Sequence, residues 1–336
     1  MELLPGVEWG EGQTMITLKN LQEAQARLKG VVVHTPLVRY FDLSAGAAAE
    51  ELYFKPESLQ PIGSFKLRGA YNKIASLTEA ERARGVITYS SGNHAQGVAS
   101  AARALGAHAV IVMPAAAPRV KREATAALGA EIVTVGDGSD ERREKALELS
   151  RAKGYVVIPP YDDAEIIAGQ GTAGLEILAD MPDVELILVP VGGGGLSSGV
   201  AAAVKLSGSS ARVIGVEPAL ASDAQQSLSA GHVVRIAAES AASTVADGLR
   251  TQSIGALNFE HLTKYLDGVV TVSEDEILRA MRQIITGARL MAEPSGAVTM
   301  AAWLFHRAEL PASRKTVAII SGGNADPKQV AEVLEG

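Results

Sequence analysis

Residues 186–199 read LILVPVGGGGLSSG, and this stretch decides the fold class. Its first six residues are apolar and mostly branched, which predicts a strand that is buried on both faces. Four glycines follow directly, and the residues after them are compatible with the start of a helix. The order of strand, glycine turn and helix is the repeating unit of an α/β protein.

Shorter apolar runs of the same kind recur along the chain, and segments with helical spacing separate them, for example residues 120–128 and 141–152. Buried strands that alternate with amphipathic helices indicate βαβ units. We therefore expect an α/β protein with mostly parallel sheets flanked by helices. The further predicted strands are residues 86–88, 109–112, 132–135, 155–158, 213–216 and 317–320.

The spacing of these runs also predicts how the chain divides into domains. Four consecutive strand–helix units lie between about residues 85 and 160, which is enough for a compact small domain. We place this small domain at residues 81–162. The large domain is then discontinuous and comprises residues 1–80 and 163–336.

The composition excludes several functional classes. The chain has no cysteine, which rules out disulfides, thiolate metal sites and a thiol nucleophile. The net charge of −7 and the scattered Lys and Arg residues argue against a nucleic-acid partner. Neither a signal peptide nor an apolar run of about 18 residues is present. We therefore expect a soluble cytoplasmic protein with no membrane partner.

One candidate site is the segment PIGSFKLRGA at residues 61–70. Ser64 can cap the helix that follows it, and this places Lys66 in the first helical turn. The positive end of the helix dipole disfavours an ammonium there, which would make Lys66 a better nucleophile toward an aldehyde. The alternative is that Lys66 and Arg68 are ordinary solvated cations.

A second candidate is the glycine loop, which comprises Gly192, Gly193, Gly194, Gly195 and Leu196. Successive backbone N–H groups of such a loop, together with the start of the next helix, can bind a phosphate. A dinucleotide site is less favoured because no acidic residue ends a strand about 20 residues later. A merely tight turn remains an alternative.

Two more candidates stand at strand ends. Ser90, Ser91, Gly92, Asn93 and His94 follow the run at residues 86–88 and offer N–H, hydroxyl and amide groups that suit a substrate carboxylate. Ser91 could transfer a proton, whereas His94 is more typical of a structural histidine. The six histidines show no spacing typical of a metal site.

Ser321 begins the segment Ser321-Gly322-Gly323-Asn324, which follows the run at residues 317–320. This serine would present a neutral hydroxyl at the end of a strand. Ser-Gly-Gly is also common in plain turns.

Taken together and in this order, the four segments resemble the pyridoxal-phosphate enzymes of fold type II. Within them the chain is most similar to the group of serine/threonine dehydratases, serine racemases and threo-3-hydroxyaspartate dehydratases. The similarity extends from His34-Thr35-Pro36-Leu37 to Ser321-Gly322-Gly323-Asn324. Residues 169–172 and 293–296 also look like signatures of this family.

The resemblance implies a role for each matching position. Lys66 would bind the cofactor aldehyde and later remove the Cα proton of the substrate. The glycine loop with Leu196 would hold the cofactor phosphate, and residues 90–94 would hold the substrate carboxylate. Asn93 would contact the pyridine 3-oxygen, Ser321 the ring nitrogen, and Glu293 would lie near the ring.

A neutral serine at the ring nitrogen stabilises a protonated pyridinium less than a carboxylate would. The cofactor is then a weaker electron sink, which favours loss of a β-hydroxyl over transamination. The predicted function is therefore that of a dehydratase, an ammonia-lyase. It would convert L-threonine, L-serine or a 3-hydroxyaspartate to a 2-oxo acid and ammonia.

The resemblance also implies a metal site. The positions of Glu217, Ala221 and Asp223 bind a divalent cation in the racemase branch, and two carboxylates with a carbonyl suit Mg²⁺, Ca²⁺ or Mn²⁺. The two acids could instead be ordinary loop residues. Arg143 aligns with a racemase arginine that approaches the ligand, so it could bind a second substrate carboxylate or simply be solvated.

Rival functions stay open at this stage. Many threonine dehydratases have alanine where this chain has Ser91, so a serine or aspartate racemase with side dehydratase activity is an alternative. A β-replacement enzyme is another, although such enzymes usually differ in their asparagine and phosphate loops. A binding protein without turnover is opposed by the presence of Lys66. The resemblance suggests a homodimer, and we expect no C-terminal regulatory domain.

Overall fold

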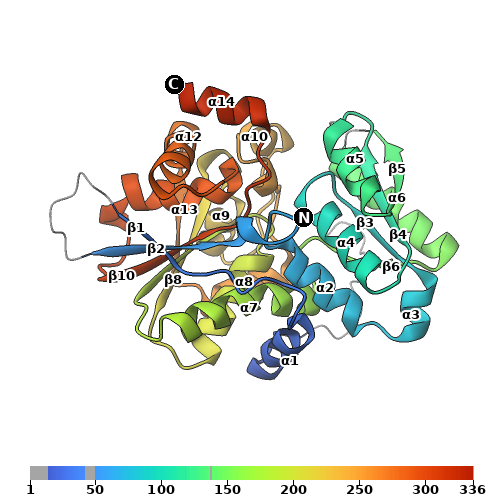
Figure 1. Cartoon of the computed structure of the whole chain (residues 1–336), viewed down its shortest axis with the longest axis horizontal. Coiled ribbons are helices and arrows are strands. Elements are labelled where there is room, and N and C mark those ends of the chain that lie inside the picture. Colours follow the sequence, from blue (N-terminus) through green and yellow to red (C-terminus); the bar gives the residue numbers. More distant parts are fainter. Residues whose placement is uncertain (1–13, 42–49, 118, 137, 336) are drawn as a thin grey trace.

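The computed structural model describes residues 14–41, 50–117, 119–136 and 138–335. These residues form two sheets, each flanked by helices (Figure 1). The smaller sheet has the strand order β5-β4-β3-β6, and its pairs are parallel. Its elements are β3 (Val86–Tyr89), α4 (Asn93–Ala104), β4 (Ala109–Pro114), α5 (Arg119–Ala127), β5 (Glu131–Val135), α6 (Ser139–Lys153) and β6 (Val156–Val157).

The larger sheet has the strand order β1-β2-β10-β7-β8-β9. β1 pairs with β2 in the antiparallel direction, and the other described pairs of this sheet are parallel. Its strands are β1 (Val38–Tyr40), β2 (Glu51–Pro56), β7 (Leu186–Pro190), β8 (Arg212–Pro218), β9 (Gly268–Val272) and β10 (Lys315–Ile320).

Helices cover both faces of the larger sheet, so its central strands are buried on both sides. β7 shows the consequence in its residue pattern. Leu186 and Leu188 belong to the core cluster beneath α12 (Glu274–Gln283) and α13 (Pro294–Phe305). Ile187 and Val189 belong to the opposite cluster. That cluster contains residues of α1 (Leu18–Leu28), α7 (Ala164–Asp180) and α8 (Gly195–Leu206), and α11 (Ala256–Tyr265) adds Leu257 and Tyr265.

The shorter elements complete the described chain. They are η1 (Glu57–Leu59), α2 (Lys66–Ser76), α3 (Glu79–Arg84), η2 (Ala219–Ala221), α9 (Asp223–Ala230), α10 (Ala238–Ser243), η3 (Asp247–Leu249), η4 (Ile284–Ala288, a π-helix), η5 (Arg307–Glu309) and α14 (Pro327–Glu335).

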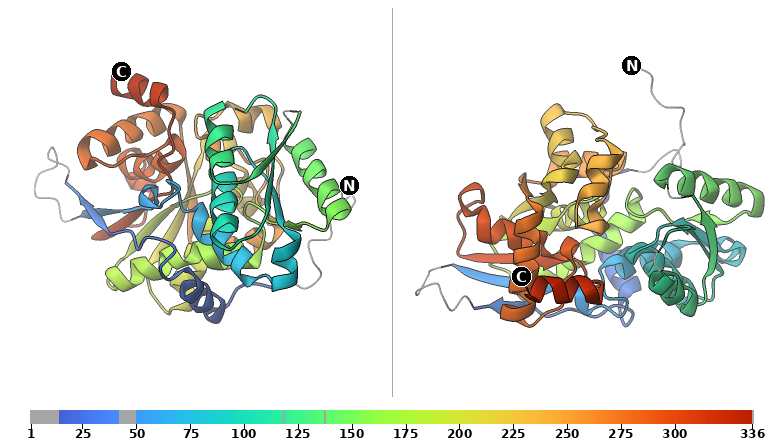
Figure 2. Two further views of the ribbon diagram at one scale, coloured as in Figure 1. Left: turned by 45° about the vertical axis from the view of Figure 1, so that its right-hand side comes forward. Right: turned by 90° about the horizontal axis from the view of Figure 1, so that it is seen from above.

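The predicted α/β class is confirmed, and every predicted strand appears with its ends shifted by a few residues. The predicted runs omit β1, β2 and β9. The two views in Figure 2 show the smaller sheet, with its helices, as a separate body beside the larger sheet. Its strands fall between residues 86 and 157, while the domain boundaries at residues 81 and 162 stay a prediction.

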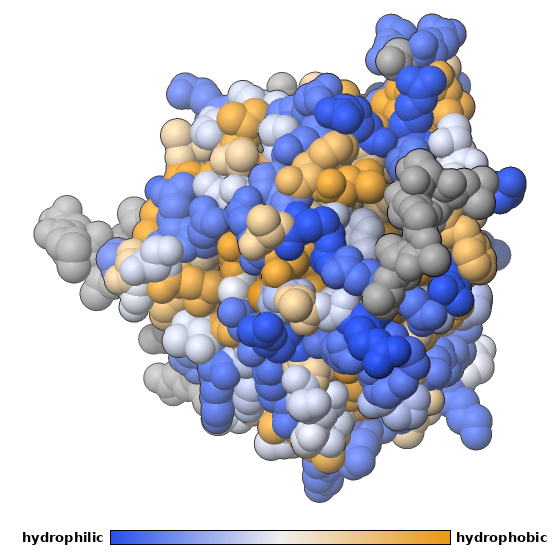
Figure 3. All heavy atoms as spheres, turned by 90° about the vertical axis from the view of Figure 1, so that its left-hand side faces the viewer, coloured by the Kyte–Doolittle hydropathy of each residue, from blue (hydrophilic) through white to orange (hydrophobic). Residues whose placement is uncertain are grey.

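No helix in the described ranges is both long and apolar enough to cross a membrane. On the face shown in Figure 3, apolar side chains lie among polar ones. The large apolar side chains that stay exposed among the described residues are Val33, Phe41, Leu59, Val233, Met291 and Leu334.

Candidate active site

The lysine segment and the Ser-Gly-Gly segment lie side by side. Ser64 and Gly322 form an isolated antiparallel bridge. The N–H of Phe65 donates to the carbonyl of Ser321 over 3.1 Å, and the N–H of Gly323 donates to the carbonyl of Gly63 over 2.9 Å. The backbone therefore fixes Lys66 close to Ser321 before any cofactor binds.

Lys66 is the first residue of α2, in the first turn as predicted. Its Nζ donates to the carbonyl of Pro160 over 2.8 Å. The side chain is half-buried, and burial around the ammonium lowers its pKa to about 8. The pKa shifts in the predicted direction, and its cause is desolvation of the buried ammonium.

The predicted cap at Ser64 is wrong. Phe65 occupies the N-cap position of α2, and no side chain caps the helix there. The Ser64 side chain is buried, and its Oγ has no hydrogen-bond partner among the residues that the structure describes. A buried hydroxyl two residues from Lys66 is thus available to a bound polar group.

The segment at residues 90–94 leads from β3 into α4, and α4 packs against the start of α2. A Cβ added to Gly97 would lie 3.1 Å from the carbonyl oxygen of Lys66. The N–H of Ser90 donates to the carbonyl of Val112, and its Oγ accepts from the N–H of Gly92. These bonds order the loop that contains Ser91.

His94 has the structural role that the sequence favours. Its Nε2 lies 3.0 Å from the carbonyl of Ile158, which makes Nε2 the donor. Burial, and then the nearby charge of Lys66, lower the pKa of His94 to about 3. The imidazole is therefore neutral at physiological pH and contributes no charge to the site.

Asn93 connects two segments of the site. Its Nδ2 donates to Oε1 of Glu293, and its Oδ1 accepts from Nδ2 of Asn324, each over 2.7 Å. A Cβ on Gly322 would lie 2.4 Å from that Glu293 oxygen, so a larger residue there would displace the Glu293 carboxylate from Asn93. The sequence analysis assigned no role to Asn324, although it directly follows the Ser-Gly-Gly motif.

The glycine loop has the geometry of an anion site. Gly194 has a φ of +97°, which favours glycine, and α8 begins at Gly195. The first N–H groups of a helix have no acceptor within it, so they are free to bind an anion. A Cβ on Gly193 would lie 2.2 Å from the ring of Tyr161, so this ring covers the loop. The sequence analysis did not single out Tyr161.

Ser321 follows β10 and is 4% exposed. Its Oγ makes one long contact of 3.4 Å, to the carbonyl of Ser295. The hydroxyl therefore remains able to bond a further polar atom. Its assignment to the ring nitrogen of the cofactor stays a prediction.

The charge of Arg143, on α6, affects the pKa of two tyrosines, Tyr89 and Tyr161. Burial raises the pKa of Tyr89 to about 12, and the charge of Arg143 opposes this rise. Burial also raises the pKa of Tyr161, and Arg143 opposes that rise as well.

Glu217, at the end of β8, and Asp223, at the start of α9, are both fully buried. The two oxygens of Glu217 accept the N–H groups of Ala224 and Gln225, each over 2.9 Å. Burial, and then the charge of Asp223, raise the pKa of Glu217 well above its ordinary value. Oδ2 of Asp223 has no hydrogen-bond partner within the described residues.

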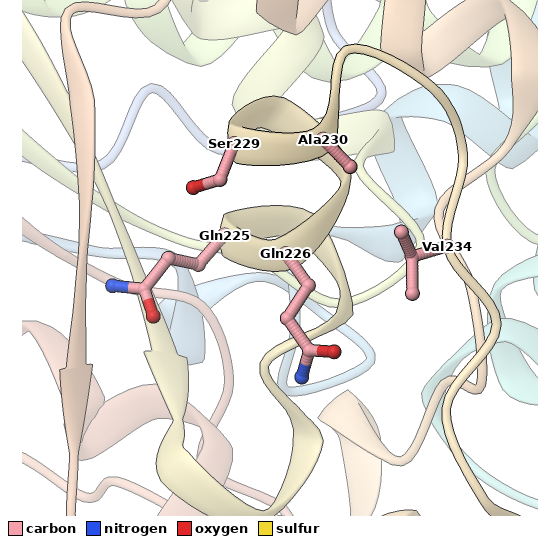
Figure 4. A pocket seen from close by; sticks show the side chains of 5 residues that line it. All are labelled: Gln225, Gln226, Ser229, Ala230 and Val234. Atoms are coloured by element: carbon pink, nitrogen blue, oxygen red, sulfur yellow. The ribbon is translucent and has the colours of Figure 1, made fainter.

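An open hollow lies beside α9, the helix that Asp223 begins. Figure 4 shows its lining, which carries amide, hydroxyl and apolar side chains. None of these side chains ionises, so we assign the hollow no catalytic role. The lining residues are Gln225, Gln226, Ser229, Ala230 and Val234.

Arg68 is not a surface cation. Its side chain is completely buried and pairs with both Glu57 and Glu176 over 2.7 Å. Lys55, also fully buried, pairs with Glu176 over 2.6 Å. This buried ion network ties α2, two residues after Lys66, to β2, η1 and α7.

Similarity to known proteins identifies the family. The family model described as "pyridoxal-phosphate dependent enzyme" matches residues 28–322. The chain belongs to this family. It is 46% identical to L-threonine ammonia-lyase of Thermotoga maritima over 95% of this chain and 78% of that protein. It is 37% identical to L-threo-3-hydroxyaspartate ammonia-lyase of Saccharomyces cerevisiae, over 95% of this chain and 97% of that protein. The structure of maize serine racemase superposes with a TM-score of 0.89 at 35% identity, covering 96% and 98% of the two chains.

These findings confirm the predicted family, the fold class and the predicted function as a pyridoxal-phosphate-dependent dehydratase of the ammonia-lyase type. The site fits the cofactor. Lys66 has an amine of lowered pKa, which suits the cofactor aldehyde. The turn at Gly194 leads into α8, whose first N–H groups suit the cofactor phosphate. The unpaired hydroxyl of Ser64 is available to a further polar atom.

Proposed function

We propose that the protein converts L-threonine, and L-serine as a second substrate, to the 2-oxo acid and ammonia, with Lys66 moving the proton at Cα. The observation that carries this proposal is the amine of Lys66. It is half-buried, has a pKa of about 8 and donates to the carbonyl of Pro160. The identity of 46% to an L-threonine ammonia-lyase supports threonine.

The residues of the site would share the tasks of the reaction, and Lys66 would both bind the cofactor and move the Cα proton. Bound pyridoxal phosphate supplies the electron sink that lets Cα lose its proton. The N–H groups of residues 90–94 bind the substrate carboxylate and orient Cα toward Lys66. The glycine loop holds the phosphate, and Asn93 and Ser321 bind the ring substituents. Lys66 takes the proton, the β-hydroxyl leaves as water, and hydrolysis releases ammonia.

The experiment that tests the proposal is a panel of β-hydroxy amino acids assayed for release of 2-oxo acid. We expect L-threonine to have the highest kcat/KM. A 3-hydroxyaspartate is the second candidate, because the chain is 37% identical to an L-threo-3-hydroxyaspartate ammonia-lyase, and Arg143 would bind its second carboxylate. If the wild type prefers the 3-hydroxyaspartate and Arg143→Met loses that preference, the 3-hydroxyaspartate replaces L-threonine as the proposed substrate.

The rate at which the cofactor-free protein captures pyridoxal phosphate should depend on the pKa of Lys66. Only the neutral amine attacks an aldehyde, so the rate should rise with pH through about 8 and then level off. A solvated lysine would instead give a rise that continues toward 10.5. Stopped-flow absorbance measures the rate, with Nα-acetyl-lysine, which keeps a free side-chain amine, as the control. If the midpoint of the rate's rise with pH lies near that of the control amine, the Lys66 ammonium is not desolvated and the prediction is wrong.

Glu217, Asp223 and the carbonyl of Ala221 are proposed to bind Mg²⁺. No group of three or more His, Cys, Asp or Glu side chains suits a metal in the described ranges, so water would complete the shell. Mg²⁺ at about 100 times its Kd should stabilise the native state by about 2.7 kcal/mol, which is measurable by thermal unfolding.

The matched variants decide whether the stabilisation arises at this site. Asp223→Asn should abolish it, whereas Asp275→Asn, on the exposed face of α12, should leave it unchanged. A protein whose unfolding is indifferent to both chelator and Mg²⁺ would refute the metal site.

Ser91 is proposed to return a proton to Cα from the side opposite Lys66. Inversion needs two acid/base groups on opposite faces of one carbon, while elimination from an L-substrate needs only Lys66. Ser91→Ala should therefore abolish interconversion of D- and L-serine and keep most of the 2-oxo acid release. Chiral chromatography measures the first activity. Equal loss of both activities would make Ser91 a carboxylate-binding residue.

We also propose that the protein is a homodimer. The exposed apolar side chains of Leu59 and Met291, each 47% exposed, are compatible with a contact between copies. Sedimentation at several protein concentrations tests the oligomeric state.

A further inference from the structure

Residues 158–163, here called the return segment, lead from β6 back to α7 and touch several parts of the site. The carbonyl of Ile158 accepts from His94, and the carbonyl of Pro160 accepts from Lys66 over 2.8 Å. The return segment therefore contacts both α4, through His94, and the amine of Lys66. A shift of this segment would move the acceptor that holds Lys66.

Tyr161, the next residue, touches the glycine loop. A Cβ on Gly193 would overlap its ring at 2.2 Å, and a Cβ on Gly195 would lie 3.1 Å from its Cα. The loop can approach Tyr161 this closely because it has no side chains there. The ring thus forms one wall of the candidate phosphate site.

Asp162 connects the return segment to α11. Its carboxylate accepts the N–H groups of Ala256, Leu257 and Asn258 over 3.1, 3.0 and 3.4 Å. Nδ2 of Asn258 donates to the same carboxylate over 3.3 Å. An aspartate from a distant part of the chain therefore caps this helix, and its side chain is 9% exposed.

The start of α11 forms a second wall of the glycine loop. A Cβ on Gly194 would lie 2.7 Å from Cβ of Asn258. The N–H of Gly255 donates to the carbonyl of Gly193 over 3.1 Å. Asp162 thus joins Tyr161 and α11, two structures that contact the loop.

We propose that Asp162 is a positioning residue for the cofactor phosphate, because it holds Tyr161 against Gly193 and Asn258 against Gly194. This inference rests on the proposed function, which takes the glycine loop as the phosphate site. Loss of the carboxylate would let the two walls move apart, and the loop would lose its preformed shape. Affinity would then fall for ligands that carry a phosphate.

The test compares two aldehydes on cofactor-free protein. Pyridoxal phosphate and pyridoxal both react with Lys66, but only the first has a phosphate for the loop. Asp162→Asn should raise the Kd for pyridoxal phosphate about tenfold and leave the Kd for pyridoxal unchanged, as measured by fluorescence titration. Asp162→Glu, which keeps the carboxylate, should restore part of the affinity.

Asp163→Asn is the matched control. Asp163 is the neighbouring carboxylate and caps α7 through the N–H groups of Glu165 and Ile166. It pairs with Lys73 and does not cap α11. We expect this variant to leave the ratio of the two Kd values as in the wild type. Tyr161→Ala removes one wall and keeps the α11 cap, so it should repeat the Asp162→Asn pattern even if that variant folds poorly.

Equal weakening of both aldehydes in Asp162→Asn, or the same change in Asp163→Asn, would overturn the inference and leave Asp162 a structural cap. Wild-type protein that captures neither aldehyde at Lys66 would instead refute the proposed function. The two failures are therefore distinguishable.

Discussion

Lys66→Ala should abolish release of 2-oxo acid, with kcat/KM falling by at least about 10³-fold, since one residue both binds the cofactor and moves the Cα proton. The fold should survive. The Lys66 side chain is half-buried, and the polar contact found for it is a single hydrogen bond to Pro160. Circular dichroism checks the fold, and release of 2-oxo acid from L-threonine checks the activity.

The same variant tests where the cofactor is attached. Wild-type protein should be yellow, and borohydride should fix the cofactor to the peptide that contains Lys66, as mass spectrometry would show. Lys73→Ala is the matched control, because Lys73 lies on the same helix and pairs with Asp163. It should stay yellow and active. A yellow, active Lys66→Ala protein with the label on another lysine would contradict the assignment.

Much of the fold could be predicted because buried parallel strands are continuous apolar runs. β7 is the clearest case, since its residues alternate between two core clusters and none can be polar. β2 could not be found in this way. It contains Lys55, whose buried ammonium pairs with Glu176 from more than a hundred residues away and donates to the carbonyl of Thr35. β9 has the sequence GVVTV, and its four β-branched residues are typical of a strand, so it could have been predicted.

Local signals located the site but not its internal contacts. Lys66 stands at a helix start, as predicted, while Ser64 is left without its expected capping bond because the helix begins one residue later than a Ser64 cap requires. The role of Tyr161 depends on its position over Gly193, which no local pattern reveals. The sequence shows which residues can do chemistry, whereas tertiary contacts determine which of them meet.

Arg68 illustrates the same limit and leads to the largest expected effect on stability. As a sequence feature it could be a solvated cation, yet its guanidinium makes paired hydrogen bonds to both Glu57 and Glu176. Burial opposes the ionisation of Glu57, but the charge and hydrogen bonds of Arg68 more than offset this and hold its pKa below the ordinary value. Both carboxylates depend on this one cation, with Lys55 as the second partner of Glu176.

Arg68→Met should destabilise the protein by about 3–5 kcal/mol at neutral pH, because it leaves buried carboxylates without their partner. A group whose pKa is lowered by folding contributes stability above its unfolded pKa, and this contribution is lost as the pH falls. The difference between wild type and variant should therefore shrink toward acid pH, as Glu57 takes up a proton in both. Urea unfolding at several pH values measures it.

Arg39→Met is the matched control for this prediction. Arg39 pairs with Glu51 over 3.0 Å at a side-chain exposure of 44%, and such surface pairs contribute about 0–1 kcal/mol. Arg68→Lys keeps the charge, but an ammonium cannot make two hydrogen bonds to each of two carboxylates. Its loss of stability should therefore lie between those of Arg68→Met and Arg39→Met. A loss in Arg68→Met no larger than in Arg39→Met, or one independent of pH, would show that the buried network does not hold α2 and Lys66 in place.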